Sequence, residues 1–203
     1  MTATIRRYRP EDRDDVFDVC VRTGDSGADA TGLLADDSLL PEVYAAPYLD
    51  LQPDLAWVVD NGARVVGYII AAQDTTEWAR RYRRDYLPVF GRRHPLVEPP
   101  TTREERLVWV GHHPERTSVH DLDRYPAHLH IDLLPEAQGQ GLGRQLIRIL
   151  LAELRRREVP GVQLRYGETN TSAGAFYRRL GFHSLPSTPE DPFGLAIESD
   201  AAL

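Results

Sequence analysis

The sequence predicts an α/β fold, in which strands and helices pack in layers around one sheet. Three observations support this prediction. Residues 55–72 have the pattern of a β-hairpin, residues 127–157 read as a strand, a glycine-rich loop and an amphipathic helix, and shorter strand and helix patterns alternate elsewhere. A length of 203 residues suits one domain of ordinary size, or one domain with an elaborate insertion.

Charge and cysteine content restrict the functional classes. Lysine and arginine together number 24 against 31 acidic residues, the net charge is −7, and no lysine is present. Because an acidic chain repels phosphate backbones, we expect no nucleic-acid partner. No long apolar stretch predicts a membrane span, and the polar N-terminal segment does not resemble a signal peptide. The single cysteine, Cys20, excludes an internal disulfide and favours a reducing, cytoplasmic location.

The N-terminal third is expected to contain a strand, two helices and a hairpin. A short strand covers residues 4–8, and a helix begins at Pro10 behind an acidic first turn and ends at glycines. A glycine-aspartate loop and a short helix over 39–46 follow. Asn61-Gly62 separates two apolar runs, which predicts a hairpin with a type I′ turn.

The middle of the chain is harder to interpret. Residues 74–90 read as a helix with Trp78, Tyr82 and Tyr86 on one stripe, which is more typical of core packing than of a substrate wall. Its arginine run over 80–85 fits a solvated helix face, with a contact to a nucleotide phosphate as the alternative. A proline-rich loop is expected over 91–105. The apolar run at 106–111 allows a strand, with loop after it.

The C-terminal part alternates strands and helices. Strands are predicted at 127–134 and 162–166, and short ones within "FHSL" and "FGLAI". A helix over 171–181 ends at a glycine. The apolar face of the long helix that ends near Arg157 is formed by Leu142, Leu146, Ile149, Leu150 and Leu154.

The segment "PEAQGQGLGRQ" (135–145) places Gly139, Gly141 and Gly143 where that long helix begins. Helix N-termini expose unpaired N–H groups that bind anions, and glycine allows close approach and unusual dihedral angles. A Walker A loop is excluded because the chain has no lysine, and the G-x-G-x-G spacing differs from the dinucleotide fingerprint. A simple helix-entry turn is the alternative.

Two motifs in the right order carry a resemblance to a known family. Gln138-x-x-Gly141-x-Gly143 resembles the pyrophosphate-binding signature of the GCN5-related N-acetyltransferases (GNAT). Residues 133–136 resemble the end of the family's central strand. The family's closing motif, N-x-x-A-x-x-F-Y-x-x-x-G-F, is matched by Asn170, Ala173, Phe176, Tyr177, Gly181 and Phe182. The resemblance is close over about residues 127–185.

Within the family, the tract "YPAHLHIDLLPEAQGQGLG" is most similar to the acetyltransferase-like C-terminal domain of animal O-GlcNAcases and its free-standing bacterial relatives. The animal domain is suspected of having lost catalysis, whereas the intact loop here favours cofactor binding. The resemblance implies a GNAT fold over residues 1–203, with a mixed, largely antiparallel sheet of six or seven strands, splayed at its centre, and helices on both faces. Residues 73–126 would be an insertion that shapes the acceptor side, and 127–185 the acetyl-CoA-binding core.

The resemblance also implies acetyl-CoA as the donor. Backbone N–H groups of residues 139–144 would hold its pyrophosphate, and the main chain at the end of the central strand would pair with the pantetheine arm. The residues expected to bind it are Leu133, Leu134, Gln138, Gly139, Gln140, Gly141, Leu142, Gly143, Arg144, Asn170, Phe176 and Tyr177.

For the chemistry, Tyr177 occupies the family's tyrosine position and would protonate the departing thiolate, although a core tyrosine is the alternative. His128, His130 and Asp132 alternate along one strand and therefore face the same side. The family's bases favour His128, Asp132 could act through water, and Glu168 is a further candidate. Each could instead belong to a hydrogen-bonded strand face. We expect no metal, because no further ligand is predicted to join His-x-His.

The predicted function is that of an N-acetyltransferase acting on an amine, either a small molecule or a protein. A catalytically silent acetyl-CoA-binding or protein-interaction module is the alternative, and a different acyl-CoA donor would need a wider pocket near Leu133. Homodimerisation is compatible with the sequence, which does not indicate an interface.

Overall fold

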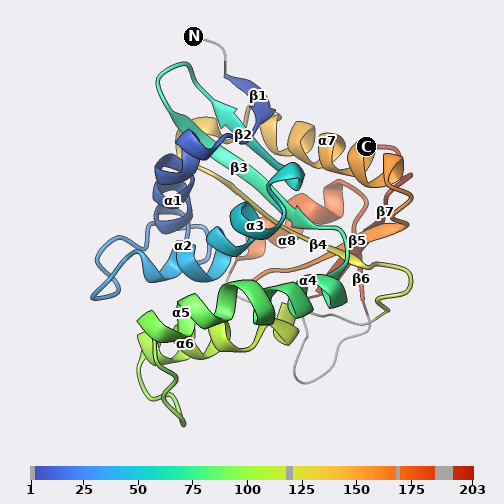
Figure 1. Cartoon of the computed structure of the whole chain (residues 1–203). Helices are drawn as coiled ribbons and strands as arrows, with labels where there is room; N and C mark the ends of the chain where they lie inside the picture. The colour runs from blue at the N-terminus through green and yellow to red at the C-terminus, as the bar shows by residue number, and fades with distance from the viewer. Residues whose placement is uncertain (1–2, 118–120, 168–169, 186–193) are drawn as a thin grey trace.

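The computed structural model describes residues 3–117, 121–167, 170–185 and 194–203, which form a seven-stranded sheet with helices on both faces (Figure 1). The strand order is β1-β2-β3-β4-β5-β7-β6, and the neighbouring strands are antiparallel except for β4 and β5. The predicted α/β fold and its mixed sheet are therefore confirmed. The strands are β1 (Thr4–Arg7), β2 (Ala56–Asp60), β3 (Val65–Ala72), β4 (Ala127–Leu133), β5 (Gly161–Arg165), β6 (His183–Ser184) and β7 (Gly194–Glu198).

The helices cover the sheet and build a separate layer over residues 75–112 (Figure 1). They are α1 (Arg13–Arg22), α2 (Leu39–Tyr44), α3 (Ala46–Leu51), α4 (Thr75–Arg81), α5 (Leu87–Arg93), α6 (Arg103–His112), α7 (Leu142–Arg156) and α8 (Thr171–Arg179). All eight residues of β3 are buried, because this strand is covered on both faces. In the part of the chain that the structure describes, no helix combines the length and apolarity needed to cross a membrane.

The sheet opens between β4 and β5. These two parallel strands pair at Ala127 with Val162 and at His128 with Gln163, and within the described residues no further register pair joins them. On its other side, β4 pairs with β3 along its length, from Ala72 with His128 to Gly67 with Leu133. The predicted splay at the centre of the sheet thus lies beside the second half of β4.

The predicted hairpin is present, but its turn is not of type I′. That turn requires a positive φ at both central residues, whereas of the Asn61-Gly62 pair Gly62 alone has one, at +89°. The loop is longer, because the Asn61 N–H donates to the Arg64 carbonyl at 3.1 Å. The side chain of Asp60 accepts from the Gly62 N–H at 2.7 Å, and a register shift between Val59 and Asp60 accompanies it. Hydrogen bonds to side-chain acceptors at the turn therefore outweigh the preference of the Asn-Gly pair for a two-residue type I′ turn.

The strand that the apolar run at 106–111 allows is not formed, because this segment lies in helix α6. Thr102 begins the helix with a capping box: its hydroxyl accepts from the Glu105 N–H at 3.1 Å, and the Glu105 carboxylate accepts from the Thr102 N–H at 3.0 Å. Gly111 lets α6 approach Phe90 of α5, since a Cβ there would lie 2.4 Å from the ring. The loop predicted over 91–105 is accordingly shorter, because α5 continues to Arg93.

The predicted helix over 74–90 forms with a π-helical turn at Tyr82–Tyr86 between α4 and α5. The aromatic stripe is buried: the ring centroids of Trp78 and Tyr82 lie 5.1 Å apart, and those of Tyr82 and Tyr86 5.0 Å apart. The stripe is buried, as expected for core packing, and Trp78 and Tyr82 also line a cavity described below. In α7 the predicted apolar face is also buried except for Ile149, which is half-buried, and Ile147 and Leu151 complete it.

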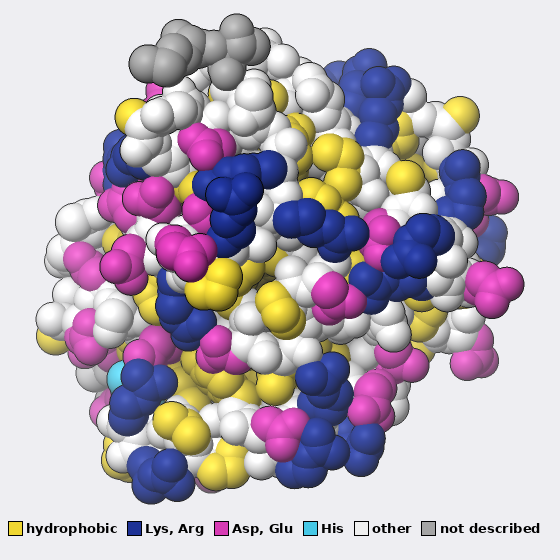
Figure 2. Space-filling model, turned by 45° about the horizontal axis from the view of Figure 1, so that its top comes forward, with side chains coloured by type: hydrophobic (Ala, Val, Ile, Leu, Met, Phe, Trp, Pro, Cys, Tyr) yellow, Lys and Arg dark blue, Asp and Glu magenta, His cyan; other side chains and the backbone are white. Residues whose placement is uncertain are grey.

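Arginines of this protein are mostly paired with acids at the surface. Figure 2 shows the two signs of charge interspersed over the face in view. In the run 80–85, Arg80 pairs with Glu77, Arg83 with Glu115 and Arg84 with Asp85, as expected for a solvated helix face. Such exposed pairs contribute little to stability.

Candidate active site

The three loop glycines meet different requirements. Gly139 and Gly141 have φ angles of +73° and +77°, in the left-handed region, and a Cβ at either position would meet no atom within 4 Å. Gly143 is helical, and a Cβ there would lie 3.0 Å from Cζ of Phe176, so this glycine allows α8 to pack close to α7. Gly141 occupies the N-cap position of α7 and no side chain caps the helix. The first-turn N–H groups are therefore available to an anion.

A cavity of about 800 Å³ opens over this loop. Of the residues predicted to bind the cofactor, those that line it are Leu133, Gln138, Gly139, Gly141, Leu142, Gly143, Arg144, Asn170, Phe176 and Tyr177. The volume is in the range of small-molecule and cofactor sites.

Leu134 and Gln140 are not among the residues that line this cavity. The buried Leu134 donates its N–H to the Val66 carbonyl at 2.9 Å, so its backbone extends the β3 pairing. The Gln140 side chain donates to the Glu136 carbonyl at 2.6 Å. Gln138 similarly donates to the Leu133 carbonyl at 2.8 Å, which fixes the loop against the end of β4.

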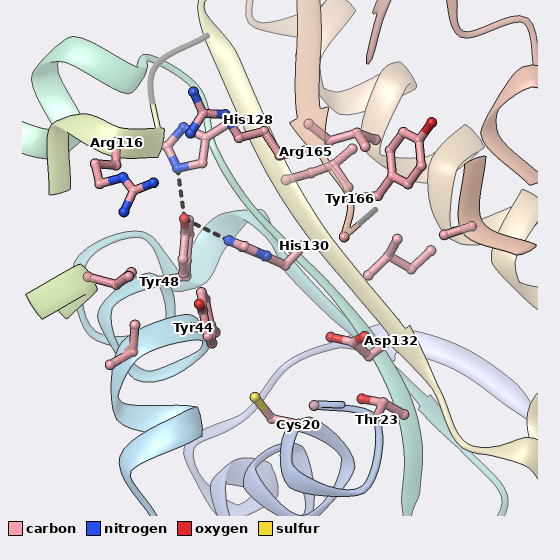
Figure 3. A pocket seen from close by; sticks show the side chains of 18 of the residues that line it. Cys20, Thr23, Tyr44, Tyr48, Arg116, His128, His130, Asp132, Arg165 and Tyr166 are labelled. Carbon is pink, nitrogen blue, oxygen red and sulfur yellow. Dashed lines mark hydrogen bonds between the residues drawn. The ribbon is translucent and has the colours of Figure 1, made fainter. Parts of the chain in front are cut away.

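A second cavity, of about 520 Å³, lies against β4 and beneath the α4–α6 layer (Figure 3). We call it the aromatic cavity. Its aromatic and histidine side chains are Tyr44, Tyr48, Trp78, Tyr82, His113, His128, His130, Tyr166 and Tyr177. They come from α2, α3, the 75–112 layer, β4, the segment after β5 and α8, so that elements distant in the sequence converge on one space.

The two cavities meet. The residues that line both are Thr23, Ser26, Gly27, Ile131, Asp132, Asn170, Ala173 and Tyr177. Asp132 and Tyr177 are the two titratable side chains in this shared set, so both lie at the junction of the two cavities. Asn170 caps α8 here, with its side chain accepting from the Ala173 N–H at 3.0 Å.

His128 is fixed in a chain of hydrogen bonds. The Thr75 hydroxyl donates to the Pro126 carbonyl at 2.7 Å, so it accepts from Nδ1–H of His128 at 2.8 Å. Nε2 of the neutral ring then accepts from the Tyr48 hydroxyl at 2.8 Å, and the Tyr48 oxygen accepts from Nε2–H of His130 at 3.1 Å. Burial lowers the pKa of His128 to about 3 and that of His130 to about 4, so both rings are uncharged at neutral pH.

Asp132 has a different environment. It is half-buried, and desolvation of its carboxyl raises its pKa above the usual value. The Tyr68 hydroxyl donates to Oδ2 at 2.6 Å from the paired position of β3 and opposes that rise. The carboxyl is thus held in one orientation at the junction.

Tyr177 is 7% exposed, and burial raises its pKa, so its hydroxyl stays protonated over the physiological range. Its ring packs against Phe176 and Phe182, with centroids 5.2 and 5.3 Å away. Glu168, the remaining candidate, lies outside the described residues. Among the described residues, no group of three or more His, Cys, Asp or Glu side chains is arranged to hold a metal ion.

Sequence reasoning did not identify Tyr48, Tyr68 or Thr75, which hold the predicted residues in place. Tyr68 had a signal, because it lies in a predicted hairpin strand that otherwise presents apolar side chains. Tyr48 and Thr75 had none, since their partners on β4 are 80 and 53 residues away.

Comparison with known proteins agrees with the family that the sequence motifs resemble. A family model for the acetyltransferase (GNAT) domain matches residues 106–184. The crystal structure of a protein named SsHAT superposes with a TM-score of 0.94 and 41% identity, covering 99% of this chain and 100% of the other. The PaiA N-acetyltransferase from Thermoplasma acidophilum, solved in complex with coenzyme A, has a TM-score of 0.58 at 14% identity and covers 98% and 99% of the two chains, which shows a shared fold.

Two curated relatives match parts of their length. Mycothiol acetyltransferase of Streptomyces griseus is 40% identical over 66 residues, which is 32% of this chain and 22% of the relative. Protein O-GlcNAcase of Rattus norvegicus is 19% identical over 198 residues, which is 96% of this chain and 21% of the relative. The chain spans about a fifth of the length of these relatives.

Proposed function

Because the chain belongs to the GCN5-related N-acetyltransferase superfamily, we propose that it transfers an acetyl group from acetyl-CoA to an amine by direct attack on the thioester. One observation carries the proposal: the cavity over the glycine loop and the aromatic cavity meet at Asp132 and Tyr177. A donor in the first cavity and an acceptor in the second would bring their reacting groups together at these side chains.

The first cavity fits acetyl-CoA. The uncapped N–H groups at the start of α7 and the open space around Gly139 and Gly141 form a cradle for pyrophosphate. The half of β4 that is not register-paired with β5 faces the opening of the sheet, where the amide-bearing arm would pair as an added strand. When bound, acetyl-CoA would supply the thioester carbonyl that an amine attacks.

Asp132 is our proposed base. An alkylammonium has a pKa of about 10.4. Complete transfer of its proton to a carboxylate is therefore uphill. The raised pKa of Asp132 narrows the difference between the pKa values of the ammonium and the carboxyl group. The negative carboxylate would attract the ammonium and accept its proton, directly or through water. Tyr68 keeps the carboxylate oriented.

Tyr177 is our proposed acid. Burial keeps its hydroxyl protonated, and because Tyr177 lines both cavities, it would lie beside the leaving sulfur of a donor that follows β4. A thiolate whose conjugate acid has a pKa of about 8.5 departs more easily when it is protonated.

For His128 we propose a positioning role. Both of its ring nitrogens are occupied, and a conjugate acid with a pKa of about 3 makes a weak base. Through Tyr48 it holds His130 at the wall of the aromatic cavity. Residues 73–126 would shape the acceptor side, since Trp78, Tyr82 and Arg116 from this segment line the same cavity.

The test has two stages. Isothermal titration with acetyl-CoA, on the wild type and on Gly141→Asp, measures donor binding. Release of the CoA thiol in the presence of a panel of amines then measures transfer. The chain has no lysine, so acetyl-lysine found after incubation with a protein acceptor derives from that acceptor. Micromolar binding with amine-dependent thiol release is expected. Binding without transfer to any amine would favour a silent acetyl-CoA-binding module, and absence of binding would overturn the proposal.

A further inference from the structure

Two arginines line the aromatic cavity at the end remote from the junction. Arg116 extends from the 3-10 turn at Pro114–Thr117, and Arg165 is the last residue of β5. Figure 3 shows both near the His128 end of the row formed by His128, His130 and Asp132, with Asp132 at the other end. The guanidinium of Arg116 also lies over the Trp109 ring, 4.9 Å from its centroid, which restricts its position.

The charge of this cavity is therefore divided along its length. Among the described residues that line it, Asp132 is the one carboxylate, and Arg116 and Arg165 are the permanent cations. His128 and His130, between the two ends, are uncharged at neutral pH because burial lowers their pKa values. A ligand thus meets negative charge at the junction and positive charge at the far end.

The two arginines offer a ligand hydrogen-bond donors and no acceptors. Their N–H groups and positive charges call for the same kind of ligand group at this end of the cavity, an oxyanion such as a carboxylate or phosphate. Trp78 also lines the cavity, but the surface of its Nε1 atom is covered, so this donor is not available to a ligand.

We propose that the acetyl acceptor is a small zwitterion, an amine that also carries a carboxylate or phosphate, with its ammonium at Asp132 and its oxyanion at Arg116 and Arg165. The inference rests on the proposed transfer reaction and specifies its substrate class. The cavity volume of about 520 Å³ fits a small molecule.

The geometry also restricts the separation of the two groups. His128 and Asp132 are four residues apart on β4, which corresponds to about 13 Å at about 3.4 Å per residue. Arginine side chains shorten that span, but an α-amino acid, whose ammonium and carboxylate share one carbon, cannot reach both ends. A polyamine is disfavoured for a different reason, because its second ammonium would face two guanidinium groups.

The experiment compares ligands that differ in one terminal group. The protein is saturated with CoA, and binding of 6-aminohexanoate, 1-aminohexane and 1,6-diaminohexane is measured by isothermal titration. A second pair of the same length, 6-aminohexyl phosphate and 6-aminohexan-1-ol, distinguishes phosphate from carboxylate. The variants are Arg116→Gln and Arg165→Gln. Arg80→Gln is the matched control, because Arg80 lies on the exposed face of α4 and pairs with Glu77.

We expect an oxyanion-bearing amine to bind at least ten-fold more tightly than its neutral counterpart, and the diamine to bind most weakly. Each pocket-arginine variant should reduce that preference about ten-fold, whereas Arg80→Gln should retain it. Whichever pair shows the larger preference identifies the oxyanion. Equal binding within both pairs, no binding by any member, or preference for the diamine would overturn the inference. Titration of acetyl-CoA into the same proteins without added CoA separates the two proposals: donor binding without oxyanion preference leaves the transfer reaction standing, and loss of donor binding refutes that reaction.

Discussion

The hydroxyl of Tyr68 donates a 2.6 Å hydrogen bond to Oδ2 of Asp132, across a register pair of β3 and β4. Both side chains lie on the face of the sheet that lines the aromatic cavity, and both have raised pKa values because they are desolvated. Since Tyr68 stays protonated, it acts as a fixed donor, and Asp132 is held by its partner strand rather than by a loop. A proposed base on a central strand is therefore positioned as rigidly as the sheet itself.

Asp132→Asn should lower the rate of acetyl transfer by about 100-fold or more, because general bases typically contribute at this level. The amide oxygen still accepts from Tyr68, and the variant removes a desolvated carboxylate, so its melting temperature should equal or exceed that of the wild type. Steady-state kinetics and thermal denaturation test both statements. A wild-type rate would exclude Asp132 as the base.

Tyr68→Phe should shift the pH profile and leave the chemistry in place. The hydrogen bond from Tyr68 lowers the pKa of Asp132, so its removal raises that pKa further. Transfer requires the ionised carboxylate, and the acid limb of kcat/KM should therefore move to higher pH. The profile is measured from pH 5 to 9 on both proteins, and an acid limb at the wild-type position would contradict the assignment.

Tyr177→Phe should reduce turnover ten-fold or more while the dissociation constant of acetyl-CoA stays nearly constant. The substitution removes the hydroxyl at the junction and retains the ring that packs against Phe176 and Phe182. Single-turnover kinetics and isothermal titration separate the two effects. An unchanged rate would show that Tyr177 is a core residue without a role in proton transfer.

Gly141→Asp should abolish acetyl-CoA binding, since it adds a Cβ at a φ of +77° and a negative charge where pyrophosphate is expected. Gly32→Asp is the control. Gly32 has a φ of +74° with nothing within 4 Å of its added Cβ, and it lines neither cavity. Both variants should lose about 1 kcal/mol of stability from the left-handed backbone. Equal affinities for acetyl-CoA would show that the loop does not bind the donor.

The histidines of β4 should make the fold acid-sensitive. Burial lowers the pKa of His128 to about 3 and of His130 to about 4, below the ordinary 6.5, so the unfolded chain binds more protons between these values and 6.5. Stability is therefore lost as pH falls through this window, by up to about 1.4 kcal/mol per pH unit for each histidine. Urea unfolding from pH 4.5 to 7 measures the slope. His128→Gln should flatten it.

Local sequence patterns predicted the parts of this protein that depend on short spacings. The glycines at 139, 141 and 143, the cap at Asn170 and the aromatic stripe of α4 all involve residues within a few turns of one another, so their order in the chain records their geometry. The helix at 103–112 was missed although Thr102 and Glu105 carry a capping signal, because a short apolar run suits a strand equally well.

Properties that depend on distant partners were not accessible in this way. The sequence placed His128, His130 and Asp132 on one face, and the family resemblance favoured His128 as the base, whereas the hydrogen bonds and burial of these side chains support our proposal of Asp132. Their ranking depends on Tyr48, Tyr68 and Thr75, which tertiary structure brings to β4. Arg116 and Arg165 likewise reach the same cavity from two segments that lie far apart in the sequence.

The opening between β4 and β5 divides the cooperativity of the sheet. Strand β5 is joined to β4 by the pairs at Ala127 and His128, whereas it pairs with β7 along its whole length. Strands β5, β6 and β7 should therefore open as a partly independent unit, and their amide hydrogens should exchange faster than those of β3. A donor that pairs its amide arm with the free edge of β4 would act as an added strand in the opening between β4 and β5. Acetyl-CoA would then slow exchange in β5 and couple the two parts of the sheet.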